Sequence, residues 1–327
     1  MGSPLISVIV CAYNEGNNIN NCLLALSKQN FNNYEIIIVD DGTDINDPSI
    51  QIMDQYEKKY ENIVVIHKEN SGSISARMTG VKNSRGKYVT FVDADDFVSS
   101  DYIKVITKIV NYKDADLYQL NNKVNKKGKN QFETEKKFLE NDNNVSVNQM
   151  YEWILTGKTG AVWDKIYKRE LFPEISSSIF FGEDVFINAN YLKCIKNIVV
   201  FDYSIYYHII DSSTSGSTTS KSSYKKFLDI DDLYVFVKSL LDNSFIDKRV
   251  FEEFIVVYLT NIAHGSGDLF RLGLKQTEIT STIGKLNIVK DWLSCIKTNN
   301  FKKTVYIWCL RKQQYRLIAF IDKVVRG

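Results

Sequence analysis

The chain has 327 residues, and its 41 Lys and Arg against 39 Asp and Glu give a formal net charge of +2. The length suits one large domain, or one domain with a second appended, and the balanced charge argues against a dedicated nucleic-acid-binding protein. Five scattered cysteines without C-x-x-C spacing indicate reduced thiols, as in a cytoplasm. No apolar run reaches the ~18 residues that a membrane span needs, and no signal peptide precedes Leu5.

The first part of the chain alternates strand-like and helix-like segments. Short apolar runs at residues 6–12, 35–39, 63–66 and 88–92 predict buried strands. Helices are expected between and after them, because apolar residues recur at helical spacing in Ile19, Cys22, Leu23 and Leu26, and again in Tyr102, Val105, Ile106 and Ile109. This order predicts an α/β fold with a doubly wound, mostly parallel sheet.

The rest of the chain is more varied. Residues 121–148 are rich in Lys, Asn and Glu and predict an exposed excursion, residues 198–207 predict a strand, and residues 212–223 predict a mobile loop or linker. Helical patterns follow to the end. Residues 301–327 hold seven Lys or Arg against one acid, and their apolar stripe consists of Leu317, Phe320, Ile321 and Val324. We expect this stripe to pack on the first domain; a second subunit or an anionic membrane surface are the alternatives.

Three carboxylates follow the strand predicted at 88–92, namely Asp93, Asp95 and Asp96. Carboxylates this close repel one another unless a cation or a hydrogen-bond donor lies between them. A set of ligands made only of oxygen atoms suits Mg²⁺ or Mn²⁺. A solvated helix N-terminus would also accommodate these acids. Because ligands of such sheets bind at the carboxyl ends of strands, Asp40 and Tyr13 are expected to face the same crevice.

Five segments together resemble the family 2 glycosyltransferases of GT-A fold. They are residues 7–15, 38–44, 70–72 with Ala76 and Arg77, 86–96, and 163–167. The resemblance extends over residues 5–215. It implies a GT-A catalytic domain at 1–215, with a nucleotide-binding half at 1–100 and an acceptor-binding half at 101–215, followed by a helical region at 216–327.

The resemblance also implies roles on the donor side of the site. Asp40 matches the acid that reads uracil, Asp93 lies near the ribose or sugar and on the metal, and Asp95 binds the metal. Asp96 lies beside the donor sugar, and Arg77 pairs with a phosphate or with a structural acid. The remaining donor-binding residues are Ala12, Tyr13, Glu15, Asn70 and Ala94. His208 is either a further metal ligand or a structural histidine.

On the acceptor side, Glu183 and Asp184 match the family's E-D motif. A sugar hydroxyl is a poor nucleophile, so a carboxylate must take its proton during attack, and the resemblance assigns this base to Asp184. Glu183, Trp163 and Lys165 are expected to line the acceptor site, although Trp163 could be core packing and Lys165 a surface charge. One displacement without a covalent intermediate inverts the anomeric centre.

These expectations describe an inverting hexosyltransferase that uses Mn²⁺ or Mg²⁺ and moves a sugar from a UDP-sugar to a lipid- or protein-linked surface glycan. Capsular polysaccharide, teichoic acid and glycoprotein glycan are the acceptor classes considered. We expect it in the cytoplasm, with the inner membrane face and a homo-oligomer through the C-terminal helices as further hypotheses. The alternatives are a non-catalytic sugar-nucleotide or glycan-binding module and an aspartyl-nucleophile phosphatase. A nicotinamide-dependent dehydrogenase is excluded, because no G-x-G-x-x-G follows the first strand.

Overall fold

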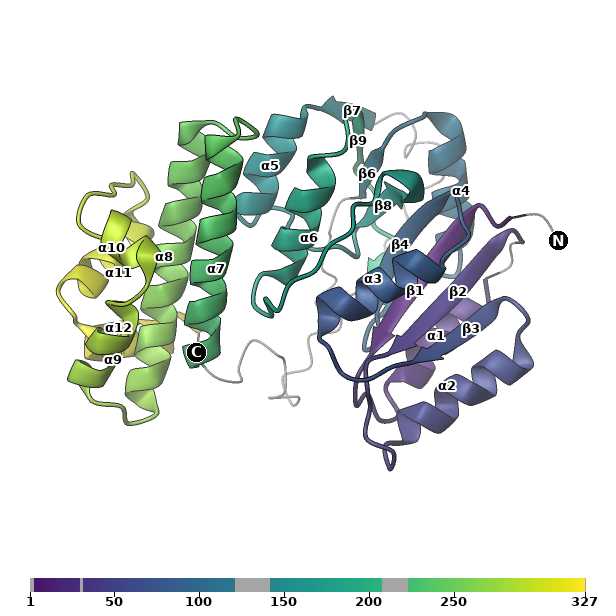
Figure 1. Ribbon diagram of the computed structural model, residues 1–327, viewed down its shortest axis with the longest axis horizontal. Coiled ribbons are helices and arrows are strands. Elements are labelled where there is room, and N and C mark those ends of the chain that lie inside the picture. The colour runs from purple at the N-terminus through teal and green to yellow at the C-terminus, as the bar shows by residue number, and fades with distance from the viewer. Residues whose placement is uncertain (1–2, 30–31, 121–141, 208–222, 327) are drawn as a thin grey trace. The chain divides into compact units, whose positions relative to one another are not determined.

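The computed structural model describes residues 3–29, 32–120, 142–207 and 223–326 (Figure 1). The chain divides into two units. The first comprises Met1–Met150, Ala161–Ser178 and Glu183–Asp211, and the second comprises Tyr151–Gly160, Ile179–Gly182 and Ser212–Gly327. The predicted domain boundary after residue 215 falls outside the described residues and stays a prediction.

One sheet of eight strands organises the first unit, in the order β3-β2-β1-β4-β8-β6-β9-β7. Its strands are β1 Ile6–Ala12, β2 Tyr34–Asp40, β3 Ile63–His67, β4 Tyr88–Asp93, β6 Leu117–Leu120, β7 Asp142–Val145, β8 Lys165–Lys168 and β9 Ile198–Phe201. The first four in this order are parallel, and so are β6 and β9. β8 runs antiparallel to β4 and β6, and β7 antiparallel to β9. The predicted doubly wound, mostly parallel α/β fold is confirmed.

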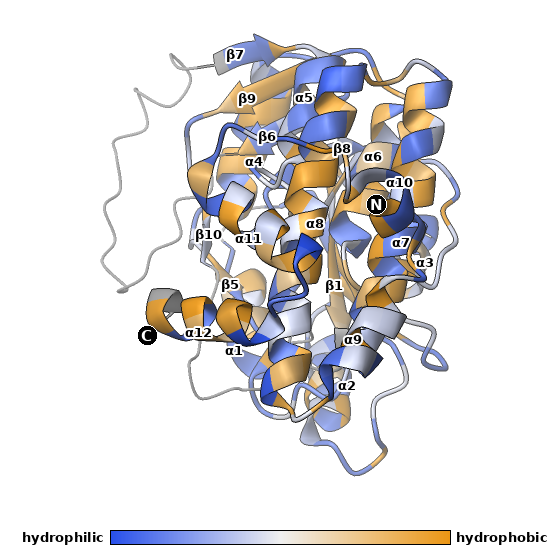
Figure 2. Cartoon of the chain, turned by 90° about the vertical axis from the view of Figure 1, so that its left-hand side faces the viewer, coloured by the Kyte–Doolittle hydropathy of each residue, from blue (hydrophilic) through white to orange (hydrophobic). Residues whose placement is uncertain are grey.

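The central strands are buried because their sequences are almost wholly apolar. Every residue of β2 is buried, as are six of the seven in β1, and Figure 2 colours β1 and β9 as mainly hydrophobic. Strands covered on both faces need such runs of β-branched residues. The helices that contribute residues to this unit are α1 Ile19–Ser27, α2 Pro48–Lys59, α3 Ser73–Asn83, α4 Tyr102–Tyr112, α5 Val147–Leu155 and α6 Glu183–Leu192.

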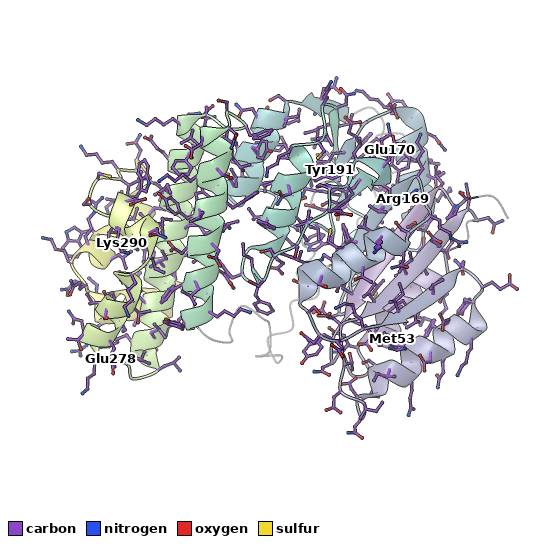
Figure 3. The ribbon with its side chains drawn as sticks, in the orientation of Figure 1. Met53, Arg169, Glu170, Tyr191, Glu278 and Lys290 are labelled. Atoms are coloured by element: carbon purple, nitrogen blue, oxygen red, sulfur yellow. The ribbon has the colours of Figure 1, made fainter. Side chains whose placement is uncertain are left out.

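The helix patterns explain how these elements begin and pack. The predicted stripe of α1 is buried at all four positions. Asp47 caps α2 by accepting from the Ser49 N–H, and Pro48 occupies the first helical position, which requires no hydrogen-bond donor. Met53 of α2, labelled in Figure 3, is fully buried in the core of the first unit.

Two segments differ from expectation. The strand predicted at 198–207 forms β9 and a separate β10 (Tyr206–Tyr207), which pairs antiparallel with β5 (Phe97–Val98). Within the polar excursion predicted at 121–148, residues 121–141 are outside the described part, whereas Asp142–Val145 form β7 at the sheet edge. Asp and Asn are rare in strands, so the composition favoured a loop, but the antiparallel ladder with β9 overrides this local preference.

The second unit is mainly helical. Its helices are α7 Ser223–Asp242, α8 Lys248–Arg271, α9 Gln276–Ile283, α10 Asn287–Trp292, α11 Phe301–Arg311 and α12 Tyr315–Arg326. α7, α11 and α12 all pack on α8. Gly267 allows the close approach of α12, since a Cβ there would lie 2.8 Å from the Cγ2 of Ile318 in that helix. Among the described residues, no helix is long and apolar enough to cross a membrane.

Candidate functional site

Four parallel strands end in register at one edge of the sheet. β1 ends with Cys11 paired to Asp93 of β4 and Ala12 paired to Asp40 of β2. Asp40 in turn pairs with His67 at the end of β3. Parallel strands present their carboxyl ends on the same edge, where ligands of α/β sheets bind. The predicted donor-side acids therefore flank the end of β1.

Asp40 is held by hydrogen bonds on both carboxylate oxygens. It is buried, its Oδ1 accepts from the Thr43 N–H at 2.9 Å, and its Oδ2 lies 2.7 Å from Nδ1 of His67. The other ring nitrogen of His67 lies 3.1 Å from Asp54 Oδ1 in α2. The hydrogen bond to Asp40, and then that to Asp54, raise the pKa of His67 against the opposing effect of burial. Asp40 thus has a fixed orientation at the strand end.

The loops after β1 and β2 are tied to each other. Asn14 has a left-handed backbone with φ of 53°; its N–H donates to Thr43 Oγ1 at 3.1 Å, and its Oδ1 accepts from the Asp44 N–H at 2.9 Å. Ala12 is buried beneath this junction, whereas 51% of Tyr13 is exposed. The Tyr13 ring is consequently available at the surface of the strand-end edge.

Asp41 orders the turn that leads into α3. Its carboxylate pairs with Lys68 at 2.6 Å and accepts from the N–H groups of Ser71 and Gly72 at 3.0 and 2.8 Å. Asn70, in the same turn, is exposed. A carboxylate with an ammonium group and two backbone donors is well satisfied, so Asp41 has a structural role, and it fixes the start of the helix that carries Arg77.

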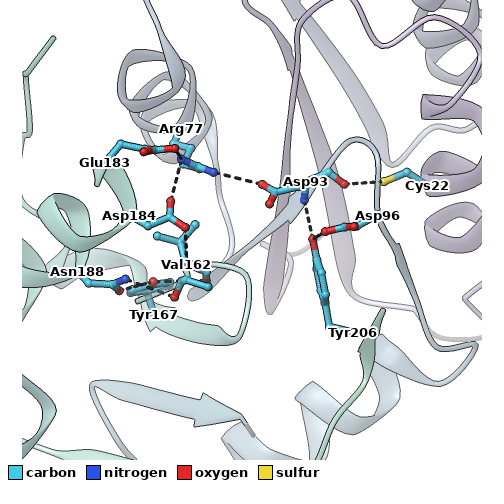
Figure 4. Close-up of polar contacts among 11 residues, drawn as sticks. Cys22, Arg77, Asp93, Asp96, Val162, Tyr167, Glu183, Asp184, Asn188 and Tyr206 are labelled. Carbon is cyan, nitrogen blue, oxygen red and sulfur yellow. Dashed lines mark hydrogen bonds and ion pairs between the residues drawn. The ribbon is translucent and has the colours of Figure 1, made fainter. Parts of the chain in front are cut away.

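Arg77 joins the strand-end acids to the E-D pair (Figure 4). Its buried guanidinium reaches Asp93 Oδ1 with Nη2 at 3.2 Å and Asp184 Oδ1 with Nη1 at 3.0 Å. Glu183 Oε1 lies 3.9 Å from Nη1, and Asp184 also accepts from the Val162 N–H at 3.3 Å. Residues about a hundred positions apart in sequence are thereby gathered around one cation.

This cluster carries more acid than Arg77 neutralises. Burial, with the added repulsion of Asp184, Asp96 and Asp95, raises the pKa of Asp93 to about 6 although Arg77 lowers it. Burial and Asp184 raise the pKa of Glu183 to about 7. Burial, with Asp95 and then Asp93, raises the pKa of Glu15 to about 7. Such perturbed carboxyls are typical of functional sites.

Tyr206 is part of the cluster, although no motif in the sequence identifies it. Its hydroxyl donates to Asp96 Oδ2 at 2.7 Å and accepts from the Asp93 N–H at 3.0 Å. Its ring stacks on Trp163, with centroids 4.3 Å apart and planes 14° apart. The pairing of β10 with β5 brings Tyr206 here, and only that long-range pairing could have identified it.

The structure places the other predicted residues differently from one another. Ala94 and Asp96 are buried behind the strand end, whereas Asp95 is exposed. Lys165 does not lie on an open surface: its fully buried ammonium group donates to the Ala161 carbonyl at 2.6 Å and pairs with Asp164 at 2.7 Å. We therefore correct its expected place on the acceptor wall to a structural one. His208 lies outside the described residues.

The carboxylate oxygens at the strand end suit a hard divalent cation. Within the described residues, no group of three or more His, Cys, Asp or Glu is arranged to hold a metal ion. Mg²⁺ and Mn²⁺ are often bound by one or two carboxylates together with substrate phosphates. Burial first, and neighbouring carboxylates second, raise the pKa values of Asp93 and Glu15. The residues therefore fit a cation that is completed by a phosphate-bearing substrate.

Comparison with known proteins identifies the family. Residues 7–176, more than half of the chain, match the model for "Glycosyl transferase family 2". The chain belongs to this family. This family 2 protein is 32% identical over 233 residues to glycosyltransferase GlyA of Streptococcus pneumoniae serotype 4, a match that covers 66% of this chain and 32% of GlyA.

Solved structures agree on the fold of this family 2 protein. Residues 1–349 of S. aureus TarS in complex with UDP-GlcNAc superpose with a TM-score of 0.64 at 22% identity, covering 98% of this chain and 91% of that one. The mannosyltransferase PcManGT of Pyrobaculum calidifontis, in complex with GDP-Man and Mn²⁺, gives 0.53 at 13% identity, covering 99% and 88%. The predicted GT-A architecture with C-terminal helices is confirmed.

Proposed function

We propose that this family 2 protein is an inverting, metal-dependent glycosyltransferase that moves a sugar from a UDP-sugar to a hydroxyl group of a surface glycan. UDP as the carrier is supported by the TarS complex with UDP-GlcNAc and by Asp40, a carboxylate that can accept from a base N–H. Because the chain aligns with only about a third of GlyA, the proposal concerns the chemistry of the site described here.

The observation that carries the proposal is the Arg77 bridge between Asp93 and Asp184. It joins an acid at the strand end, where the donor phosphates are expected, to an acid of α6. A glycosyl transfer needs charge stabilisation at the leaving diphosphate and a base at the incoming hydroxyl. Asp93 would meet the first need by holding a divalent cation beside the diphosphate, and Asp184 would meet the second by taking the proton.

In this proposal Asp184 takes the proton from the acceptor hydroxyl. The guanidinium of Arg77 lies 3.0 Å from Oδ1 of this carboxylate, and the Val162 N–H, which donates to Oδ2 at 3.3 Å, fixes its orientation. A divalent cation, bound through Asp93 and Asp95, would supply electrostatic stabilisation of the departing diphosphate. Tyr13 and Asp40 bind the nucleoside, and Asp96, buried and held by Tyr206, supports the strand end beside the donor sugar. Among the described residues, Asp184 is assigned as the base and no carboxylate is assigned as a nucleophile, which favours single displacement with inversion.

Only the positions of Glu183 and Trp163 support the proposed acceptor site. Glu183 adjoins Asp184 at the start of α6, and Trp163 presents an aromatic ring next to the Asp96–Tyr206 pair. Aromatic faces suit the apolar faces of sugar rings. A capsular polysaccharide, a teichoic acid or a glycoprotein glycan remains the proposed acceptor class.

The test of the base is Asp184→Asn in the full chain. The amide oxygen can still accept from Val162, but it cannot take a proton, so we expect transfer to fall by about 10²- to 10⁴-fold. Calorimetric binding of UDP with Mn²⁺ should stay nearly unchanged. Glu183→Gln is the matched control, because it removes a neighbouring charge near Arg77 and should cost far less turnover. Loss of UDP affinity in Asp184→Asn would remove Asp184 from the base role.

Asp95→Ala is the complementary variant. It should abolish the Mn²⁺-dependent part of UDP binding, and unchanged binding would contradict the metal assignment. The donor is identified with a panel of UDP-, GDP- and dTDP-sugars. For each sugar nucleotide, the thermal stabilisation of the protein and the hydrolysis of the donor are measured. Stabilisation by a donor without turnover under any condition would favour the non-catalytic binding module.

A further inference from the structure

α12 has two apolar faces, and the second unit buries only one of them. The inner face packs on α8 through Tyr315, Ile318, Ala319 and Asp322, which are all buried. The opposite face carries Leu317, Phe320 and Val324, which are 39%, 63% and 65% exposed. Positions i, i+3 and i+7 line one side of a helix, so these three form a continuous stripe. We call it the α12 outer stripe.

A buried polar network fixes which face of α12 points inward. Asp322 Oδ1 accepts from the Tyr306 hydroxyl at 2.7 Å and lies 2.8 Å from Nδ1 of His264. These partners belong to α11 and α8, so the network ties three helices together. A rotation of α12 that buried the outer stripe would remove Asp322 from both partners. The stripe is therefore a fixed feature of the outer surface of this unit.

Basic residues accompany the outer stripe. Arg316 and Lys323 lie on the same side of α12 as Phe320, and within the described residues neither forms an ion pair. The only acid in residues 301–327 is Asp322, which is buried. In Figure 2 hydrophobic and hydrophilic residues alternate around α12. Trp308 and Lys302 of the neighbouring α11 are also exposed and add one apolar and one basic side chain.

We propose that the α12 outer stripe docks on an anionic lipid bilayer surface. A helix of twelve residues is about 18 Å long, shorter than a hydrocarbon core of about 30 Å, so it would lie in the plane of the interface. Leu317, Phe320 and Val324 would enter the headgroup boundary while Arg316 and Lys323 meet lipid phosphates. A second copy fits less well, because a twofold contact would bring the same basic residues together.

Vesicle sedimentation of the full chain tests the proposal. We expect binding to phosphatidylcholine vesicles that contain phosphatidylglycerol, weak binding to phosphatidylcholine alone, and release by salt. The double variant Phe320→Ser, Val324→Ser should lose about tenfold or more in vesicle affinity. Leu272→Ser is the matched control: Leu272 is 74% exposed at the end of α8 but lies outside the stripe, and its variant should bind like the wild type.

The charge contribution is tested separately. Arg316→Gln and Lys323→Gln should each weaken binding to the anionic vesicles by about fivefold and flatten its salt dependence. Circular dichroism and thermal midpoints equal to wild type establish that the variants are folded. The proposal is overturned if the wild type fails to bind at low salt, or if the double variant binds equally well. It is also overturned if the stripe instead mediates dimers in sedimentation velocity without vesicles.

Discussion

At the scale of single residues, Arg77 compensates only part of the negative charge in the candidate site. One buried guanidinium contacts Asp93 and Asp184 directly and has Glu183 nearby. Removing one partner of such a buried cluster leaves charge uncompensated, which costs more than the pair itself contributes. Burial first, with neighbouring acids, raises the pKa values of Asp93 and Glu183, so the ionised forms of these two carboxyls oppose folding.

Tyr206→Phe isolates the residue that the sequence analysis missed. The variant keeps a ring to stack on Trp163 but removes the donor to the buried Asp96 and the acceptor of the Asp93 N–H. We expect the free energy of unfolding to fall by about 1–3 kcal/mol, together with weaker Mn²⁺-dependent UDP binding. Urea denaturation and calorimetry measure the two effects. Tyr112→Phe, on the exposed side of α4, is the control that should change neither.

His67 gives the stability a defined pH dependence. Its pKa is raised from the ordinary 6.5, first by Asp40 and also by Asp54, so the folded state binds the proton more tightly than the unfolded state. This contribution is fully present below pH 6.5 and is lost as the pH rises through the folded pKa. The difference in melting temperature between wild type and His67→Gln should be largest below pH 6.5 and should shrink as the pH rises above it. A difference that grows with pH would contradict the assignment.

At the scale of elements, the attachment of α12 depends on one carboxylate. Asp322→Ala would leave Tyr306 and His264 without their common acceptor, so we expect a loss of about 1–3 kcal/mol in the free energy of unfolding. Lys323→Ala, at the adjacent exposed position, should stay within about 0.5 kcal/mol of wild type. Urea denaturation followed by circular dichroism compares the two, and equal stability would mean that the network adds little to α12 packing.

The elements also differ in how far the sequence alone predicts them. Strands β1 to β4 were predicted closely, because buried parallel strands require apolar runs and the acids mark where those runs end. β7 was not, since Asn and Asp at an edge give no local strand signal and only pairing with β9 defines it. Tyr206 and Lys165 show the same limit: their roles depend on contacts with residues distant in sequence.

At the scale of the whole chain, the sequence motifs predicted the family and the fold, but not which helices contact one another. The order of motifs places Asp40, Asp93 and Asp184 in a GT-A protein, and the strand register explains why the first two are neighbours. The contact of Asp184 with Arg77 needs α3 and α6 to meet, which no local pattern encodes. Likewise, the stripe of α12 was visible in the sequence, whereas the face left exposed depends on how α12 packs against α8.

The reversed direction of β8 has a consequence for how related chains can diverge. Because β8 runs against β4, with Thr90 opposite Ile166 and Tyr88 opposite Lys168, the segment that leads into β8 arrives at the edge where β4 ends. Trp163 lies in that segment, two residues before the strand. Substitutions or insertions there can reshape one wall of the site while every strand keeps its partner. If the proposed function holds, exchange of this short loop would change the substrate preference while strands β1 to β4 are inherited unchanged.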